Sequence, residues 1–368
     1  MQKNKPVISI LVPCYNVEKF LPQCLDSIVN QTLRDIEIIC INDGSTDKTL
    51  DIITSYAKHD DRIVVIDKPN EGYGKSMNRG LDAATGKYIG IVESDDWVDA
   101  NMFESLVRIA EENDVQVVKS NFYEYTTTNG EENKLRRLIP EHNADRVICA
   151  RQETGIFLCQ PSIWSAIYRR DFLNENNIRF LESPGASYQD VGFNFKVWLM
   201  SDRVWLTPVA YLHYRCDNEN ASVKSKSKVL CVCDEWNEVE RYISEHSEMF
   251  DGTRELIPHV KWGNYKWNLL RLDEPARTEF QQVLTREYDG HIKRDEFRRI
   301  FFDDRSWFDI FHMIYHQSLS VRFWRIFYRV ISPIYKTRVK YCTKKYYLFG
   351  FIHVRNTKKL PQIKVTVK

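Results

Sequence analysis

Three carboxylates lie close together in the segment YIGIVESDDW, residues 88–97. Glu93, Asp95 and Asp96 come directly after a run of apolar residues, where a buried strand would give way to a turn. Acidic residues are common in turns of this kind, and a turn exposed to solvent needs no ligand to explain them. Carboxylates one residue apart at a strand end can also converge on a hard cation such as Mg²⁺ or Mn²⁺, which would bridge the phosphates of a nucleotide. The segment by itself is compatible with both interpretations.

A second candidate, Asp43, follows the apolar run IEIICI in the segment NDGSTDKT, residues 42–49. Its carboxylate would project from a strand end and could accept hydrogen bonds from a base or a ribose. Ser45 and Thr46 have the residue types of a helix N-cap, which accounts for them without a ligand. A cap of this kind does not account for Asp43.

Asp190 stands at the start of a predicted helix in SYQDVGFNFKVW, residues 187–198. The spacing of Val191, Phe195 and Trp198 predicts an amphipathic helix with one buried stripe. An aspartate at this position can be explained as an N-cap. A carboxylate held in a half-buried cleft is also what a general base requires.

Four other side chains could take part in binding. Lys75 lies in a Gly-Lys-Ser sequence, but Pro69 stands where a P-loop requires its first glycine, so Lys75 would act as a single charge near a phosphate. His213 in YLHYR could contact a metal or a diphosphate, or be a satisfied core residue. Arg215 is a comparable candidate, and Trp164 is either a core residue or a platform for an acceptor.

The elements that must position these residues follow from the hydropathy pattern. Five β-branched runs alternate with helical spacing, at residues 7–12, 36–41, 62–66, 88–92 and 115–119. This alternation predicts an α/β fold with a mainly parallel sheet flanked by helices. Ligands bind beyond the carboxyl ends of such strands, where Asp43 and ESDD both fall. The polar stretch 126–137 indicates a surface loop. Gly86 is predicted to be the C-terminal cap of the helix in SMNRGLDAAT, residues 76–85.

Composition separates a main body from a tail. With 43% hydrophobic and 28% charged residues, the 368-residue chain is ordinary for a globular protein with one large and one smaller domain. Nine cysteines without a CxxC pair, and an N-terminus without the apolar stretch of a signal peptide, predict a cytoplasmic location. Residues 310–368 hold 13 Lys and Arg and no acid. The net charge of +1 is therefore the sum of −12 on residues 1–309 and +13 on residues 310–368.

The tail at 319–368 contains a basic amphipathic pattern. Within residues 321–340, Arg322, Arg325 and Arg329 share one helical face, opposite Phe323, Phe327, Val330 and Ile334. This pattern predicts a helix in an anionic membrane interface, on the cytoplasmic face of a membrane. A helix docked on the acidic main body is the alternative. We do not expect nucleic acid as a partner, because no recognised binding module accompanies the charge.

Several motifs in order resemble an inverting glycosyltransferase of family 2, of the bacterial surface-polysaccharide type. They are VPCYNVEKFLPQCLDSIVNQT, INDGSTDKT, NRGLDAATGKYIGIVESDDW, WSAIYRRDFL, YQDVGF and YLHYR, within about residues 6–222. The resemblance implies a GT-A fold over residues 1–225, with a nucleotide-binding half (1–120) and an acceptor half (121–225). A helical extension, 226–318, would precede the tail.

The resemblance also implies roles for individual residues. ESDD falls where the family keeps its metal-binding DxD motif, so Asp95 and Asp96 would hold the donor ribose and a Mn²⁺ or Mg²⁺ ion at the diphosphate. Pro13, Tyr15 and Asp43 would surround the nucleobase, which is usually uracil in this family. Residues from the first half of the chain would therefore bind the donor.

Asp190 falls where the family places its catalytic base. It would take a proton from the acceptor hydroxyl as that oxygen attacks the anomeric carbon opposite the leaving diphosphate, without a covalent intermediate. We therefore expect a metal-dependent transferase that moves a sugar from a nucleotide-sugar, UDP-linked by family resemblance, to a saccharide or lipid-linked acceptor of a surface polysaccharide.

Three positions depart from the family pattern. Glu93 replaces the first Asp of DxDD, and Gln189 replaces the Glu that commonly precedes the base. Met77 stands where many members have an Arg, which leaves contact with the donor phosphates to Lys75 or Arg79.

Two other classes of protein remain as alternatives. The first is a GT-A-like binding protein that tethers partners through its basic tail without turnover, against which the retained acidic residues argue. The second is a nucleotidyltransferase, which shares the alternating sheet and a metal but needs a glycine-rich phosphate loop near its N-terminus. The segment LVPCYNVEKF has no glycine.

Overall fold

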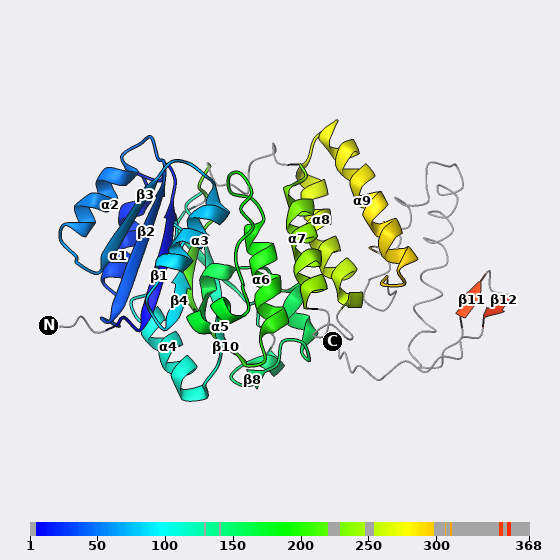
Figure 1. The fold of residues 1–368 in the computed structure, drawn as a ribbon, viewed down its shortest axis with the longest axis horizontal. Helices are drawn as coiled ribbons and strands as arrows, with labels where there is room; N and C mark the ends of the chain where they lie inside the picture. Colours follow the sequence, from blue (N-terminus) through cyan, green and yellow to red (C-terminus); the bar gives the residue numbers. More distant parts are fainter. Residues whose placement is uncertain are drawn as a thin grey trace. The chain divides into compact units, whose positions relative to one another are not determined.

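The computed structural model describes residues 5–128, 130–139, 141–219, 229–246 and 254–297, with residues 306, 310, 346–348 and 352–354. It divides into two compact units, residues 1–305 and 306–368 (Figure 1). In the second unit, the short strands β11 (Tyr346–Leu348) and β12 (Ile352–Val354) pair antiparallel. The amphipathic helix predicted at 321–340 lies outside the described residues.

A mixed sheet forms the centre of the first unit. Its strands are β1 (Ile8–Cys14), β2 (Ile36–Asp43), β3 (Ile63–Lys68), β4 (Tyr88–Ile91), β5 (Trp97–Val98), β6 (Val117–Thr126), β7 (Glu132–Arg136), β8 (Val147–Ile148), β9 (Ala166–Arg169) and β10 (Val204–Arg215). The main path runs β3–β2–β1–β4–β9–β6–β10–β5. Strands β1 to β4 are parallel and β6 is parallel to β10, whereas β9 is antiparallel to both its neighbours. The predicted α/β fold with a largely parallel sheet is confirmed.

The strands follow the apolar runs of the sequence. All five predicted strands are present with shifted bounds, and β1 and β2 are buried along almost their whole length, as expected of parallel strands covered on both faces. The prediction of a loop over 126–137 is wrong. Strand β7 lies within that stretch and pairs with β6, although all five of its side chains are exposed. Its polar sequence carries no apolar alternation, so backbone pairing alone defines it.

Helices cover the sheet and connect its strands. In the sheet region they are α1 (Leu21–Val29), α2 (Thr49–Ala57), α3 (Tyr73–Ala83), α4 (Met102–Asn113), α5 (Arg170–Glu175) and α6 (Gln189–Met200), with short 3₁₀ turns at Glu141–Asn143, Thr154–Leu158 and Ile163–Ser165. The prediction that Gly86 caps α3 is wrong, because the C-cap is Ala84. Gly86 instead packs on β1, where a Cβ would lie 2.5 Å from the backbone nitrogen of Ser9.

Three further helices lie beside α6 in the range predicted to be helical. They are α7 (Cys231–Glu245), α8 (Ile257–Arg271), which follows a 3₁₀ turn at Arg254–Leu256, and α9 (Ala276–Lys293). Each packs against the one before it, and α7 packs against α6 (Figure 1). Because of this cover, every residue of α6 except Asp190 is buried, so the prediction of a single buried stripe on α6 is wrong. Among the described residues, no helix is both long and apolar enough to cross a membrane.

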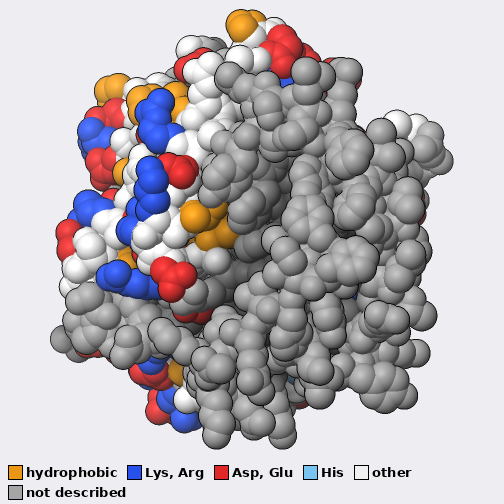
Figure 2. Space-filling model, turned by 90° about the vertical axis from the view of Figure 1, so that its right-hand side faces the viewer, with side chains coloured by type: hydrophobic (Ala, Val, Ile, Leu, Met, Phe, Trp, Pro, Cys, Tyr) orange, Lys and Arg blue, Asp and Glu red, His pale blue; other side chains and the backbone are white. Residues whose placement is uncertain are grey.

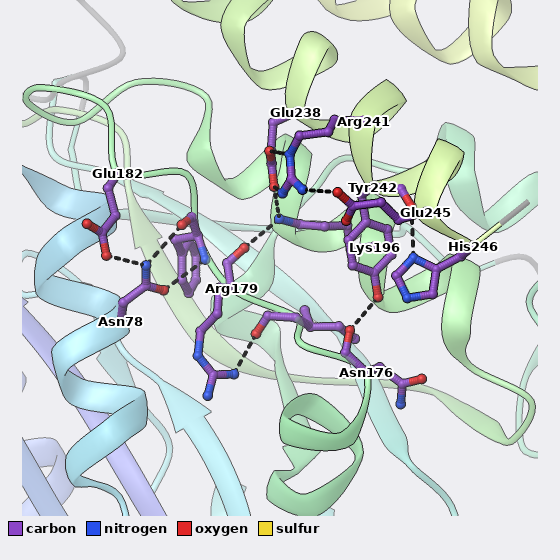
Figure 3. A network of polar contacts seen from close by, with 12 residues as sticks. Asn78, Asn176, Arg179, Glu182, Lys196, Glu238, Arg241, Tyr242, Glu245 and His246 are labelled. Carbon is purple, nitrogen blue, oxygen red and sulfur yellow. Dashed lines mark hydrogen bonds and ion pairs between the residues drawn. The ribbon is translucent and has the colours of Figure 1, made fainter.

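A network of polar contacts fixes α6 from two sides (Figure 3). The Lys196 ammonium, on α6, donates to the carbonyl oxygen of Arg179 at 2.6 Å and pairs with Glu238 of α7 at 3.3 Å. The Tyr242 hydroxyl of α7 donates to the carbonyl oxygen of Asn176 at 2.6 Å. The segment 176–182 therefore ties α7 to α6, and in the same view its further bonds reach α3.

The described surface carries charges of both signs. On the face drawn in Figure 2, basic and acidic side chains alternate, with small apolar patches between them. The described part of this face therefore presents no large area of one charge, in contrast to the composition of residues 310–368.

Candidate functional site

The acidic turn after β4 is held by the end of β10. Asp96 is 1% exposed, and its Oδ1 accepts a hydrogen bond from the backbone nitrogen of Arg215 at 2.8 Å. The neighbouring Asp95 accepts at its carboxylate from Asn218 Nδ2 (2.7 Å), and at its backbone oxygen from Arg215 Nε (2.9 Å). The turn is thus fixed by residues about 120 positions away in the sequence.

The same turn has the features of a cation site. The second oxygen of Asp96, Oδ2, is buried and has no hydrogen-bond partner among the residues that the structure describes. Burial, and then the charge on Asp95, raise the pKa of Asp96 well above its ordinary value. A buried carboxylate oxygen without a donor is costly, and a bound cation would relieve that cost. The residues present therefore fit a divalent cation.

Such a cation would need ligands from outside the chain. Within the described ranges, no group of three or more His, Cys, Asp or Glu side chains is placed to hold a metal ion. Mg²⁺ is usually bound through one or two carboxylates together with substrate phosphates and water, so this turn has the donor set of a metal–nucleotide site.

Arg215 positions the acidic turn. Its guanidinium carbon lies 4.8 Å from the ring centroid of Phe20, 5.0 Å from Trp97 and 5.2 Å from Tyr125. One guanidinium nitrogen also donates to Gln23 Oε1 at 2.6 Å. Arg215 thus supports the turn, and its predicted contact with the donor stays a prediction.

His213 belongs to an aromatic stack. Its ring lies between Trp97 and Tyr123, with centroids 4.9 Å and 5.1 Å away. Nδ1 is 2.8 Å from Asn133 Oδ1, and Nε2 is 3.1 Å from Asp99 Oδ1. Both ring nitrogens face oxygen atoms of the protein, and the predicted contact with a metal or diphosphate stays a prediction. Asn133 comes from β7, the strand that the sequence analysis missed.

The residues predicted to surround a base gather at the carboxyl ends of β1 and β2. The parallel register pairs Pro13 with Ile41, so Tyr15, just after β1, lies beside Asp43, the last residue of β2. Pro13 is buried, whereas the Tyr15 ring is 51% exposed and could stack on a base. The predicted residues are thus neighbours.

Asp43 is buried and partly engaged. Its Oδ1 accepts from the Lys68 ammonium and from the backbone nitrogen of Glu71 at 2.9 Å, and its Oδ2 accepts from the backbone nitrogen of Gly72 at 3.1 Å. These bonds shape the loop that leads into α3. A carboxylate has about four acceptor positions, so Oδ2 retains capacity for a base.

Ser45 and Thr46 do not cap a helix, since α2 begins at Thr49. The Ser45 hydroxyl accepts from the backbone nitrogen of Asn16 at 3.1 Å, and the backbone nitrogen of Thr46 donates to Asn16 Oδ1 at 2.8 Å. Their role is to join the loops that follow β1 and β2.

Two cations of α3 share one carboxylate. Lys75 Nζ lies 2.5 Å from Glu71 Oε1, and an Arg79 guanidinium nitrogen lies 2.8 Å from Glu71 Oε2. Met77 is completely buried, so no phosphate contact can come from that position. Lys75 and Arg79 are both partly exposed, and each keeps N–H donors that could reach a phosphate.

Asp190 lies at the first turn of α6, half-buried, and its Oδ1 accepts from the backbone nitrogen of Val191 at 2.9 Å. Burial raises the pKa of Asp190 to about 6, while backbone N–H groups and the Lys119 ammonium oppose that shift. Such a pKa leaves the carboxylate mainly ionised at pH 7 yet basic enough to accept a proton, which suits a general base.

The electrostatics connect Asp190 to the acidic turn. Burial, and then the charges on Asp95 and Asp190, raise the pKa of Glu93 to about 8. The Tyr73 hydroxyl donates to Glu93 Oε1 at 2.6 Å, and the pKa of Tyr73 is raised by burial and then by the charges on Glu93 and Asp190. The charges on Asp95 and Asp190 therefore both act on Glu93, so the predicted base and the acidic turn share one electrostatic environment.

Lys119 is a site residue that the sequence analysis missed. It is buried in β6, where its ammonium donates to the backbone oxygen and, at 2.7 Å, to the hydroxyl of Ser162. Burial lowers the pKa of Lys119 to about 7, and the charges on Cys159 and Asp190 oppose this. The only signal in the sequence is a lysine at the end of the apolar run VQVVK.

Gln189 explains one departure from the family pattern. Its Nε2 donates to Ser183 Oγ at 2.9 Å and to the backbone oxygen of Gly185 at 3.1 Å, and its Oε1 accepts from the backbone nitrogen of Ser187. A glutamate could not make the two donations. The amide thus closes the loop before α6.

Trp164 is a core residue, so its prediction as an acceptor platform is wrong. The ring is 6% exposed, lies parallel to Tyr214 with centroids 5.1 Å apart, and contacts Phe122 edge-on at 4.6 Å. Neighbouring rings leave no surface on which a sugar could stack.

A largely parallel sheet flanked by helices, with an acidic turn after β4 and Asp190 at the start of α6, is the architecture of the GT-A fold. The family model described as "Glycosyl transferase family 2" matches residues 9–176. Residues 9–176 are therefore similar to glycosyl transferase family 2, and the chain has a GT-A fold.

Individual relatives agree with this assignment. The protein named "Uncharacterized glycosyltransferase EpsJ" from Bacillus subtilis (strain 168) is 35% identical over 222 residues, 59% of this chain and 62% of EpsJ. "Glycosyltransferase GlyA" from Streptococcus pneumoniae is 31% identical over 204 residues, 54% of this chain but 29% of GlyA. The chain thus spans less than two thirds of the length of these relatives.

A solved structure shares the fold. The crystal structure of S. aureus TarS 1–349 in complex with UDP-GlcNAc is similar with a TM-score of 0.53 and 20% identity, covering 83% of this chain and 81% of that chain. The similarity extends beyond the segment matched by the family model.

Proposed function

We propose that the protein is an inverting glycosyltransferase that moves a sugar from a UDP-sugar to a hydroxyl of a saccharide or lipid-linked acceptor. The observation that carries this proposal is the placement of Asp190, a half-buried carboxylate with a pKa of about 6, in one electrostatic site with the acidic turn at Asp95. Residues at that turn fit a cation, and residues at the neighbouring strand ends fit a base.

In this proposal the chain's residues divide the reaction between them. Asp190 accepts the proton of the acceptor hydroxyl, whose oxygen attacks the anomeric carbon of the donor. The bond from that carbon to the diphosphate oxygen breaks, its electron pair leaves with UDP, and the configuration inverts. Asp95 and Asp96 would hold a divalent cation, which when bound neutralises charge on the leaving diphosphate. Arg215 keeps the two aspartates in place.

Support for a UDP-sugar comes from the base-binding residues and from a structural relative. Tyr15 and Asp43 lie where family resemblance places a uracil, and the TarS structure is described in complex with UDP-GlcNAc. We further propose a role in surface-polysaccharide synthesis, with the basic tail at 319–368 holding the protein on the cytoplasmic face of an anionic membrane. The motivating feature is the charge division between main body and tail.

A thermal-shift panel tests the donor. Ligands that bind only the native state raise its melting temperature, so UDP with Mn²⁺ should raise it more than GDP, CMP or Mn²⁺ alone. A larger shift with GDP would contradict the choice of UDP. Release of UDP from a UDP-sugar then separates a transferase from a tethering protein, which would bind the nucleotide without turnover.

A further inference from the structure

Helix α8 carries exposed apolar side chains close to the helix that bears Asp190. Its inward face is buried, but Trp267 is 44% exposed and Leu270 is 72% exposed. Gly263, one turn before Trp267 on the same face, is also exposed. A single exposed tryptophan is ordinary on a protein surface, so its neighbours decide whether it can contact a ligand.

The Trp267 indole is held in a defined orientation. The Tyr188 ring meets it edge-on, with centroids 5.7 Å apart, and the Arg271 guanidinium lies 4.7 Å from its centroid. The Tyr188 hydroxyl donates to Asn268 Oδ1 at 2.7 Å, and Asn268 is completely buried. Residues of α8 thus contact Tyr188 through its hydroxyl and through its ring.

Tyr188 links this surface to Asp190. It is the N-cap of α6, two residues before Asp190, and its backbone is left-handed with φ of 54°. A bulky residue rarely adopts this conformation, and such strain is found preferentially at ligand-binding and catalytic sites. The bond to Asn268 helps to hold Tyr188 there. The exposed indole is therefore continuous with the start of the helix that carries the base.

We propose that Trp267, oriented by Tyr188 and Arg271, is a subsite for the acceptor saccharide. The inference rests on the proposed function, and it names the class of acceptor as a chain of at least two sugar units. One unit presents its hydroxyl to Asp190, and a neighbouring unit stacks the apolar face of its ring on the indole. Aromatic rings are suited to this because they combine a large apolar surface with little loss of side-chain freedom.

The size of the surface favours a sugar over a protein partner. A stable protein interface buries about 800 Å² on each side, which takes some 20 to 30 residues. Two exposed side chains on one helix fall far short of that, whereas a single sugar ring is matched by one indole. The observations therefore favour a saccharide.

The test compares Trp267→Ala with Leu270→Ala, a matched truncation on the same helix. The probes are lactose, cellobiose, maltose and N,N′-diacetylchitobiose, titrated without donor into the full chain and followed by saturation-transfer NMR. We expect at least one disaccharide to bind, and Trp267→Ala to weaken it about two- to tenfold, the range that corresponds to one aromatic contact. Leu270→Ala should bind like the wild type, and Trp267→Phe should recover part of the loss.

Two outcomes would overturn the subsite: binding of none of the four disaccharides by the wild type, or equal affinities in Trp267→Ala and Leu270→Ala. Melting temperatures of the variants show whether each is folded, and Trp267→Phe keeps a ring against Tyr188 if the alanine variant is not. Binding of UDP to the wild type is measured separately. If UDP binds but the Trp267 variants bind disaccharides like the wild type, the proposed transferase stands and the proposed subsite is wrong. If Trp267→Ala weakens disaccharide binding but UDP does not bind, the proposed donor is wrong.

Discussion

Asp190 gives the most direct prediction for a single residue. A general base acts in its ionised form, and the pKa of Asp190 is raised to about 6. The kcat/KM for transfer should therefore be nearly constant from pH 7 to 8 and fall about tenfold per unit well below pH 6, because the carboxylate becomes protonated. Asp190→Asn should lose at least about a hundredfold in rate and lose this inflection.

Release of UDP, measured from pH 5 to 8, checks both effects. Glu131→Gln, which removes an exposed carboxylate, is the control for a general charge effect. An Asp190→Asn variant that kept the inflection near pH 6 would assign the base to another group.

Asp96 predicts how a cation would bind. In Asp96→Asn the Oδ1 atom can still accept from Arg215, but the negative charge is lost. We expect the variant to fold as stably as the wild type, because the replaced charge is buried. The extra rise in melting temperature that Mn²⁺ gives with UDP should disappear. Equal shifts by Mn²⁺ in both proteins would place the cation elsewhere.

The hydrogen bonds of Gln189 predict that Gln189→Glu, although similar in shape, lowers the stability of the protein. In Gln189→Glu the bonds to Ser183 Oγ and to the Gly185 carbonyl are lost, and a carboxylate faces that carbonyl. We expect a loss of about 1 to 3 kcal/mol in the free energy of unfolding, the usual cost of leaving a buried partner unsatisfied. Urea unfolding measures it, with Gln152→Glu on the surface as control. Equal stabilities of the two variants would mean that the amide is not needed.

At the scale of elements, two glycines in helices predict opposite effects of one substitution. A methyl group at Gly74 in α3 would overlap the carbonyl oxygen of Leu181, whereas at Gly263 in α8 it would meet no other described segment within 4 Å. Gly74→Ala should destabilise by about 1 to 3 kcal/mol through overpacking. Gly263→Ala should stabilise by about 0.4 to 1 kcal/mol, because alanine restricts the unfolded chain. If both variants lost stability, the close contact between Gly74 and Leu181 would not be the cause of the loss at Gly74.

The elements also show what the sequence could and could not reveal. β1 and β2 were predictable because continuous β-branched runs occur in strands buried on both faces. β7 was not, since its polar residues leave only backbone pairing to define it. The burial of α6 on all sides depends on α7, which begins some 30 residues after α6 ends.

The candidate site was predictable to a similar extent. Asp43, Asp96 and Asp190 are acids at the ends of apolar patterns, and such residue types and positions can be read locally. The two tryptophans could not be told apart. Trp164 is buried by rings from distant strands, and Trp267 contacts Tyr188 only because α8 packs beside the start of α6. Contacts of that kind depend on the tertiary fold.

At the scale of the whole molecule, the division of charge predicts a salt-dependent attachment to membranes. Residues 310–368 carry 13 basic residues and no acid. Each Lys or Arg near an anionic bilayer contributes about 1 kcal/mol, so a few acting together would hold the protein on it. Because the Debye length shrinks from about 10 Å at 0.1 M salt to about 3 Å at 1 M, high salt should release it.

Sedimentation with vesicles that contain phosphatidylglycerol measures this attachment. Simultaneous change of Arg322, Arg325 and Arg329 to Glu should reduce binding at low salt, while the same change at the exposed Lys58, Arg108 and Lys134 of the main body should leave most of it. Equal binding by the two triple variants would contradict a membrane role for the tail. A truncation after residue 318 distinguishes a membrane-binding tail from a tail docked on the main body. If the tail binds membranes, the truncated protein should lose vesicle binding and keep its melting temperature. A tail docked on the main body predicts a lower melting temperature, because its removal would expose an apolar surface.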